Sequence, residues 1–369
     1  MSQGSLVGIT LLRGLAALMV FFFHQRSRLE PGVIGTFLDQ AVFRSGYLGV
    51  DLFFILSGFV LGLSTERRQT PKNFWVRRFF RIWPCLGLSL ALMALTRPIE
   101  GAALIKGLLL IPLDPDARPP WFGYGFNPSI WTLSYEAYFY LMFGLALWLS
   151  PQRRTGVAAL LVGIPFALIQ GLDGGSLEFW NPYRALSEPL TGAWGLLSLP
   201  GNPMVLEFLL GLLAYRLFPL LKDPGPILRW ISLGLIGLFI FAYGFFLRPG
   251  HGPFQGGLWS FLLVLGILGL ESFLLRGPLL FKSMGQISYS FYLLSIPLHE
   301  VYLQTIPWIA RGPGLAAILS ECLLTGLISA MTYHFFEKPW MDRGRLLGDW
   351  LDERRQRGGK SEERRWGSY

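Results

Sequence analysis

Three titratable residues stand in apolar parts of the sequence and are candidates for acid–base chemistry. His24 ends an apolar stretch, Asp51 lies within residues 46–58, and Glu136 lies in another apolar stretch further along the chain. A charged side chain inside a membrane span costs about 2.5–3.5 kcal/mol, so an ionisable residue there usually marks a function. An imidazole beside carboxylates can act as a general base near neutral pH. The sequence therefore predicts a catalytic site made of His24, Asp51 and Glu136.

The expected depth of these residues follows from the direction of each span. With the N-terminus inside, His24 lies near the outer end of the first span, while Asp51 and Glu136 lie near the outer starts of the second and fourth. Three helices then bring ionisable groups to a similar depth, and we expect these groups to meet below the outer surface. Taken singly, His24 is equally well explained as a headgroup contact, and each carboxylate as a structural ion-pair partner.

Arginines form a second candidate site, on the cytoplasmic side. Arg13 and His24 have ten residues between them, which places them on one face of a helix about 16 Å apart. Arg78 and Arg81 belong to a dense basic and aromatic turn, residues 75–83. Guanidinium groups bind phosphates bidentately, so a polyphosphate ligand such as coenzyme A fits these residues. On composition alone, a cluster that sets topology and touches anionic lipid is the better explanation.

The composition is that of a membrane protein. The chain has 369 residues, of which 52% are hydrophobic and 15% charged, whereas about 25% are charged in a typical soluble protein. The net charge of +9 comes from Lys and Arg between or after apolar stretches, as in cytoplasmic loops, and this disfavours a nucleic-acid partner. Cys85 and Cys322 have apolar surroundings, and no metal-ligand pattern is present, so we expect no metal site.

Hydropathy predicts an all-α polytopic membrane protein with about ten transmembrane helices. The expected spans are residues 6–24, 46–64, 84–97, 130–149, 155–170, 202–219, 228–247, 257–275, 284–303 and 314–335. The stretch 101–113 is too short for a comfortable crossing. Leaving it outside puts every basic cluster on one side and both termini in the cytoplasm. We expect one membrane domain, residues 1–340, and a basic, mostly disordered cytoplasmic tail, residues 341–369.

Several residues of the outer segments are expected to have lesser roles. His251 lies in Arg-Pro-Gly-His-Gly-Pro and is interpreted as a loop residue without a function. Glu207 and Glu300 either join a reaction chamber or pair with neighbouring helices. A set of aromatic residues could stack on a sugar ring, although an interfacial aromatic belt is the simpler interpretation. This set consists of Trp121, Phe122, Tyr124, Phe126 and Trp131.

Five motifs, in order, resemble those of the family 3 membrane acyltransferases. They are Leu12-Arg13-Gly-Leu-Ala-Ala followed by His24; Gly49-Val-Asp-Leu-Phe-Phe-Ile-Leu-Ser-Gly-Phe59; Phe74-Trp-Val-Arg-Arg-Phe-Phe-Arg-Ile-Trp-Pro84; Trp131-Thr-Leu-Ser-Tyr-Glu136; and the late motifs Ile287-Ser-Tyr-Ser-Phe-Tyr-Leu-Leu294 and Phe336-Glu-Lys-Pro339. The resemblance covers residues 6–340. The late motif usually continues to a His, and here that position holds Ser295, with His299 one helical turn later.

The resemblance implies a membrane O-acyltransferase of the cytoplasmic (inner) membrane. It implies transfer of an acyl group, usually acetyl, from cytoplasmic acyl-CoA to a hydroxyl of a glycan, lipid-linked sugar or related acceptor at the outer side. His24 then matches the catalytic base, and the donor-binding arginines match Arg13, Arg78 and Arg81. We expect Asp51 or Glu136 to orient His24.

Two other classes of function remain open. A transporter of a lipid-linked sugar or small anion would also place charges along a path through the membrane. A non-catalytic scaffold is the second, although a buried imidazole and carboxylates are costly for such a protein to maintain.

Overall fold

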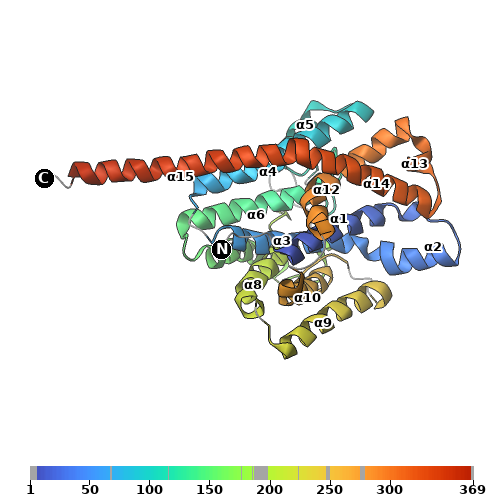
Figure 1. The fold of residues 1–369 in the computed structure, drawn as a ribbon, viewed down its shortest axis with the longest axis horizontal. Coiled ribbons are helices and arrows are strands. Elements are labelled where there is room, and N and C mark those ends of the chain that lie inside the picture. The colour runs from blue at the N-terminus through green and yellow to red at the C-terminus, as the bar shows by residue number, and fades with distance from the viewer. Residues whose placement is uncertain are drawn as a thin grey trace.

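The computed structural model describes residues 6–366, apart from 67–68, 115, 176, 185, 187–197, 223, 247–249 and 275–278. Within this described part, every regular element is helical, and the helices form one bundle (Figure 1). The α-helices are α1 (Val7–His24), α2 (Val33–Leu38), α3 (Leu48–Ser64), α4 (Pro71–Thr96), α5 (Gly101–Leu108), α6 (Ile130–Leu149), α7 (Arg154–Gly174), α8 (Val205–Leu221), α9 (Pro226–Phe241), α10 (Gly256–Gly269), α11 (Glu271–Leu274), α12 (Leu279–Thr305), α13 (Pro307–Arg311), α14 (Gly314–Thr332) and α15 (Lys338–Trp366).

Helix α3 lies at the centre of the bundle, where α1, α6, α8 and α10 pack around it. Small residues allow the closest of these contacts. A Cβ added at Gly211 of α8 would lie 2.0 Å from the carbonyl oxygen of Ile55, and one at Gly58 would lie 2.2 Å from that of Phe208. Glycine at such contacts lets membrane helices approach backbone to backbone.

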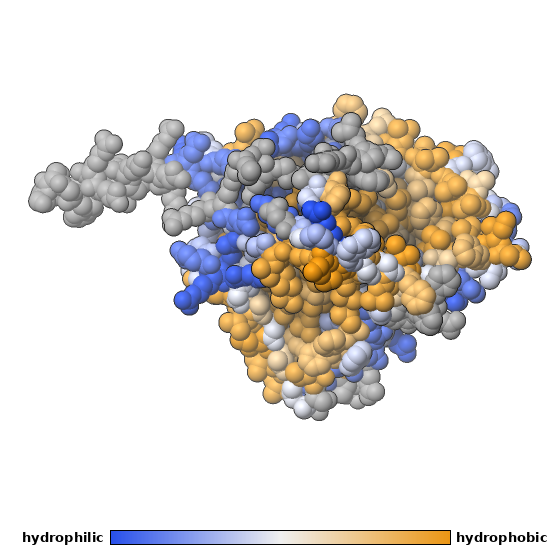
Figure 2. Space-filling model, turned by 60° about the horizontal axis from the view of Figure 1, so that its bottom comes forward, coloured by the Kyte–Doolittle hydropathy of each residue, from blue (hydrophilic) through white to orange (hydrophobic). Residues whose placement is uncertain are grey.

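The outside of the bundle is apolar. Figure 2 shows one face on which hydrophobic residues predominate and hydrophilic ones gather mainly toward the end from which α15 projects. Along α14, Leu319, Leu323, Leu327 and Met331 recur every fourth residue and are all exposed. Residues at this spacing share one face of a helix, so α14 presents an apolar stripe suited to lipid.

All ten expected spans contain or overlap helices, but only some of these helices are clear membrane crossings. Six segments of the described chain are long and apolar enough to cross a membrane. They are Val7–His24, Val33–Ser64, Pro71–Thr96, Arg154–Asp173, Pro226–Gly244 and Gly314–Arg354. Residues 247 and 275, which end two expected spans, lie outside the described residues. The total of ten crossings therefore stays a prediction, and the short stretch 101–113 contains only the eight-residue helix α5.

Two segments predicted to be cytoplasmic are more regular than expected. The basic turn at 75–83 is the first half of α4, which begins after Thr70, whose Oγ1 accepts the N–H of Asn73. A Ser or Thr cap of this kind satisfies a free N–H at the start of a helix. The tail 341–369 is likewise helical as far as Trp366. It is ordered beside α4 by polar contacts: Asn73 Nδ2 donates to Asp352 Oδ2 at 2.6 Å, and Arg77 contacts Asp349.

The two ends of the bundle carry different chemistry. Figure 1 shows the start of α1 and the far end of α15 toward the same end of the molecule, where Arg78 also lies in the first half of α4. We call this the arginine end. His24 closes α1 at the opposite end, which we call the histidine end. That the arginine end faces the cytoplasm stays a prediction of the positive-inside rule.

The contact between α3 and α8 makes a first testable prediction. Gly211→Ala forces a methyl group against the carbonyl of Ile55 and should lower stability by about 1–3 kcal/mol, the usual cost of overpacking. Thermal unfolding of the detergent-solubilised protein measures this. Gly234→Ala on α9 is the control, because nothing lies within 4 Å of its added Cβ. Equal melting temperatures for the two variants would contradict the close packing of α3 and α8.

Candidate active site

A narrow crevice of about 80 Å³ contains the three predicted donor-binding arginines. Arg13 comes from α1, and Arg78 and Arg81 come from successive turns of α4. Glu136 of α6 lines the same crevice, and so do several Phe and Tyr rings. The structure thus brings Arg13 together with Arg78 and Arg81, as expected, and adds Glu136 to them.

The crevice contains more positive charge than its acids neutralise by direct contact. Arg81 Nη1 lies 3.2 Å from Glu337 Oε1, and this is the direct ion pair of the crevice. Arg78 donates to Ser64 Oγ at 3.0 Å, and its buried Nε has no acceptor among the described residues. In the same part of the chain, neither Arg13 nor Arg78 has a carboxylate within 4.0 Å. Cations that lack an acid partner make a suitable site for an anionic ligand.

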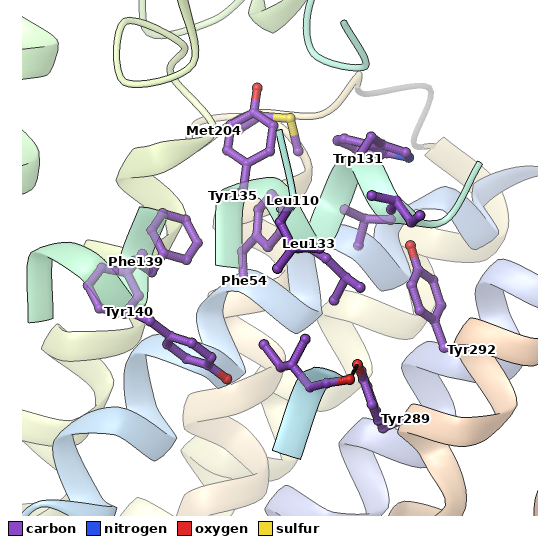
Figure 3. Packing of buried hydrophobic residues seen from close by; sticks show 14 of the residues in the cluster. Phe54, Leu110, Trp131, Leu133, Tyr135, Phe139, Tyr140, Met204, Tyr289 and Tyr292 are labelled. Carbon is purple, nitrogen blue, oxygen red and sulfur yellow. Dashed lines mark hydrogen bonds between the residues drawn. The ribbon is translucent and has the colours of Figure 1, made fainter. Parts of the chain in front are cut away.

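A wider cavity of about 510 Å³ lies at the histidine end and contains His24 and His251. Val50 and Tyr292 line both this cavity and the crevice, so the two spaces meet at these side chains. The hydroxyls of Tyr292 and Thr132 are 2.9 Å apart and hydrogen-bonded. Figure 3 shows Tyr292 and Tyr289 projecting from α12 toward the aromatic core. The crevice with the arginines and the cavity with the imidazoles therefore adjoin at these side chains.

The side chain of His24 lines two wide cavities. It lines the cavity of about 510 Å³ and also a second one of about 570 Å³, which contains Ser295 and His299. Its side chain is exposed, and among the described residues no carboxylate lies within 4.0 Å of it. The imidazole is therefore free to meet a ligand from either space.

Asp51 does not lie beside His24 as expected but pairs with His251. Asp51 Oδ2 is 2.7 Å from His251 Nδ1, and Asp51 Oδ1 accepts the N–H of Gly252 at 3.2 Å. Glu207 Oε1 accepts the same N–H at 3.0 Å. Both carboxylates are fully buried. The expectation that Asp51 orients His24 is therefore wrong, and His251, interpreted as a loop residue without a function, instead contacts a buried carboxylate.

The loop that carries His251 reaches Asp51 because glycines allow its backbone to approach. Gly252 has a φ of +123°, a left-handed conformation that glycine adopts without strain. A Cβ at Gly256 would lie 2.6 Å from Asp51 Oδ1, and one at Gly257 would lie 2.9 Å from Glu207. The glycines around His251 were the available sequence signal, since glycine often marks a close backbone approach.

Glu136 lines the crevice with the arginines, whereas His24 lines the wider cavity. It is the seventh residue of α6 and accepts a hydrogen bond from the Tyr140 hydroxyl one helical turn later. The structure therefore groups Glu136 with Arg13, Arg78 and Arg81. That Glu136 lies at the same depth as His24 and Asp51 stays a prediction.

Aromatic residues of the predicted belt line the cavity instead. Trp121, Tyr124 and Trp131 are part of the wall of the cavity of about 510 Å³. Trp121 and Tyr124 stack with ring centroids 5.5 Å apart and an angle of 19° between the planes. Tyr124 has a φ of +43°, which is uncommon for a residue other than glycine and costly to hold. These three residues are thus placed where they could contact a ligand, and the belt interpretation stays a prediction.

Two tyrosine hydroxyls of this wall remain protonated at neutral pH. Burial raises the pKa of Tyr124 above its ordinary value, and burial likewise raises the pKa of Tyr183. A raised pKa keeps a phenol neutral to higher pH. Both hydroxyls can therefore donate hydrogen bonds, and flat rings combined with such donors suit a polyhydroxylated ligand.

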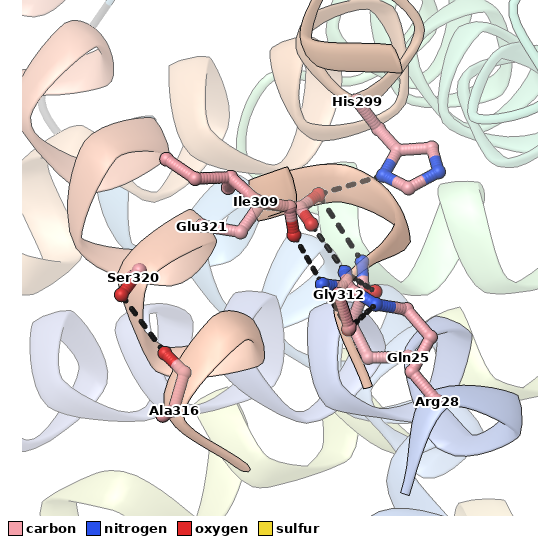
Figure 4. Close-up of polar contacts among 8 residues, drawn as sticks. All are labelled: Gln25, Arg28, His299, Ile309, Gly312, Ala316, Ser320 and Glu321. Carbon is pink, nitrogen blue, oxygen red and sulfur yellow. Dashed lines mark hydrogen bonds and ion pairs between the residues drawn. The ribbon is translucent and has the colours of Figure 1, made fainter. Parts of the chain in front are cut away.

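A third buried carboxylate at the histidine end was not among the residues predicted from the sequence. Glu321 of α14 is fully buried and contacts three polar side chains (Figure 4). His299 Nδ1 is 2.8 Å from Glu321 Oε1, Gln25 Nε2 donates to the same oxygen at 3.4 Å, and Arg28 forms an ion pair with Oε2. Arg28 also donates to the carbonyl of Gly312 at 3.2 Å. This cluster joins the end of α1 to α12, α13 and α14.

The apolar helices and the polar spaces between them define an integral-membrane helical protein with internal binding cavities. A model of the acyltransferase domain family matches residues 6–327. The chain therefore belongs to the family 3 membrane acyltransferases, and the resemblance of its motifs is confirmed. Among the described residues, no group of three or more His, Cys, Asp or Glu side chains is placed to hold a metal ion.

Curated relatives differ in how much of their length the chain matches. The exopolysaccharide production protein ExoZ of Rhizobium meliloti is 29% identical over 82% of this chain and 92% of its own length. The acyltransferase MdmB of Streptomyces mycarofaciens is 34% identical over 56% of each chain. The O-acetyltransferase OatA of Staphylococcus aureus is 27% identical over 92% of this chain, which spans 58% of OatA. No solved structure matches the chain.

The Glu321 cluster makes a prediction about stability. Glu321→Ala leaves Arg28 without its acid partner and should lower the free energy of unfolding by about 3–5 kcal/mol, as for other broken buried ion pairs. The melting temperature in detergent measures the loss. Ser320→Ala is the neighbouring control, because it removes only a hydroxyl bonded to the carbonyl of Ala316 within the same helix. A Glu321→Ala protein as stable as the control would show that the cluster does not hold this end together.

Proposed function

We propose that this protein is an O-acyltransferase that uses cytoplasmic acyl-CoA, with acetyl as the expected acyl group. The acceptor is a hydroxyl of a glycan, lipid-linked sugar or related compound at the outer side of the cytoplasmic membrane. One observation carries the proposal beyond family membership. The crevice, in which Arg13 and Arg78 have no carboxylate partner among the described residues, and the histidine cavity share the side chains of Val50 and Tyr292, which supports transfer from a donor held at one end to an acceptor held at the other.

The crevice determines how the donor would bind. A space of about 80 Å³ suits the thin pantetheine chain better than the nucleotide, so the phosphates belong at the mouth of the crevice. Arg78, with its unpaired Nε, is best placed to bind them, and Arg81 adds charge beside it. Arg13 lies further along the path proposed for the pantetheine chain. Charge-assisted hydrogen bonds of this kind are short, strong and selective for phosphate.

The cavity supplies the chemistry at the acceptor. A ring nitrogen of His24 takes the proton of the acceptor hydroxyl while its oxygen attacks the thioester carbonyl. The new C–O bond forms, the C–S bond breaks, and the protonated His24 returns the proton to the departing thiolate, giving the ester and free CoA. In this scheme Asp51 acts through His251, and Glu136 acts with the arginines of the crevice.

Replacing His24 tests the proposal directly. We expect His24→Ala to reduce acetyl transfer by about 100-fold or more, since a positioned base typically contributes that much. The assay uses purified protein in nanodiscs, radiolabelled acetyl-CoA and, as acceptor source, the envelope fraction of a strain that lacks the protein. His334→Ala is the control, because His334 is an exposed imidazole outside the three cavities described above.

Parental activity in His24→Ala would refute the assigned base. A transporter with the same connected spaces predicts a different result for the parental protein. It would move a lipid-linked sugar or small anion across proteoliposomes without loss of thioester, and acetyl-CoA consumption separates the two functions.

The donor site is tested by two neighbouring arginines. Arg78→Ala should raise the KM for acetyl-CoA about 10- to 100-fold, equivalent to one lost charge-assisted hydrogen bond of about 1.5–3 kcal/mol. Arg77→Gln is the matched control, because Arg77 contacts Asp349 and donates to Asn73 Oδ1 at 2.6 Å instead of lining the crevice. If both variants raise the KM equally, the basic cluster sets topology or binds lipid and does not hold the donor.

A further inference from the structure

Two imidazoles line the cavity of about 510 Å³, and they differ in how firmly they are held. His24 is exposed and, within the described chain, has no carboxylate partner. His251 is buried, and its Nδ1 lies 2.7 Å from Asp51 Oδ2. An imidazole fixed by a buried carboxylate is a feature of sites in which the second ring nitrogen meets a ligand. The scheme above leaves this second nitrogen, Nε2 of His251, without a role.

The surroundings of His251 determine which ring nitrogen carries the proton. An ionised carboxylate only accepts hydrogen bonds, so Asp51 selects the tautomer with the proton on Nδ1. Nε2 then keeps its lone pair and becomes a hydrogen-bond acceptor. Asp51 is itself held by the N–H of Gly252, which also binds the buried Glu207. The tautomer is therefore set by groups that the fold holds in place.

Aromatic rings fix the orientation of the same imidazole. The ring centroids of Tyr47, Trp131 and Tyr183 lie 5.3, 6.0 and 6.3 Å from that of His251. All three residues line the cavity. Because the ring is enclosed on several sides and Nδ1 is occupied, Nε2 is the polar atom that His251 can offer to a ligand in this cavity.

We propose that His251 is an acceptor-binding residue whose Nε2 accepts a hydrogen bond from a hydroxyl of the acceptor. This inference rests on the proposed acyl transfer. The donor would enter past Val50 and Tyr292, and His251 lines the cavity beside them, in contact with Asp51. A ligand with two neighbouring hydroxyls, as in a sugar ring, can present one to His251 and the other to His24. The stacked rings of Trp121 and Tyr124 offer a surface for the apolar face of such a ring.

Two substitutions separate this role from a structural one. His251→Asn puts an amide nitrogen in the place of Nδ1, so the bond to Asp51 is kept while Nε2 is removed. His251→Gln puts an amide group near the position of Nε2. A purely structural His251 would tolerate the Asn variant better, whereas an acceptor-binding His251 would tolerate the Gln variant better. Melting temperatures in detergent show whether each variant is folded.

The kinetic experiment titrates the envelope fraction at saturating radiolabelled acetyl-CoA. We expect His251→Asn to raise the half-saturating amount of that fraction by about tenfold or more, the effect of one lost hydrogen bond. His251→Gln should recover part of the loss. The KM for acetyl-CoA should stay at its parental value, because His251 does not line the arginine crevice. Parental half-saturation in a folded His251→Asn protein, or equal rises in the KM of both substrates, would overturn the proposal.

A spectroscopic measurement tests the contact without requiring acyl transfer. The chain has four histidines, so the ring nitrogens can be labelled with a nitrogen isotope and followed by NMR, with His251→Asn giving the assignment. We expect the Nδ1–H tautomer and a shift of the Nε2 resonance when glycan extracted from the envelope fraction is added. If acyl transfer is active but the Nε2 resonance does not shift when the glycan is added, the proposed role of His251 is refuted. If the Nε2 resonance shifts but no acyl transfer is detected, the binding role of His251 is supported and the proposed reaction is refuted.

Discussion

A charge inside an apolar bundle must either meet an opposite charge or face a polar space, and the rest of this structure follows from that constraint. Three buried acids satisfy it by pairing: Asp51 with His251, Glu321 with Arg28, and Glu337 with Arg81. The cations Arg13 and Arg78 and the imidazole of His24 satisfy it by lining cavities. The charged groups that hold the helices together are therefore different from those that remain available to bind ligands.

This separation gives the interior two compartments with different properties. The crevice is narrow, cationic and built from α1, α4 and α6, whereas the cavity is wide, aromatic and contains imidazoles. The proposed thioester donor and polyhydroxylated acceptor would suit these different environments. Val50 and Tyr292 belong to both walls, so in the proposed scheme the reacting groups would meet beside these side chains.

The residues proposed for chemistry and those proposed for acceptor recognition lie on different kinds of structure. His24, Arg13 and the α4 arginines are on long helices whose positions are set by packing. His251 is on a glycine-containing loop, and Trp121 and Tyr124 are on the connection between α5 and α6. Loops tolerate change better than helices. A constant reaction with an adjustable acceptor site is the physical consequence of this arrangement.

The sequence alone determined those features that depend on residues close together along the chain. Helical periodicity places Arg13 and His24 along one helix, apolar runs mark the spans, and ordered motifs identify the family. Tertiary structure decided the pairings. Asp51 meets His251 and Glu321 meets Arg28 only because the bundle brings together residues far apart in sequence. Packing likewise placed Glu136 in the crevice and Trp121 and Tyr124 in the wall of the cavity. The sequence shows which buried side chains are charged and need a partner. Which residue becomes that partner depends on how distant helices pack.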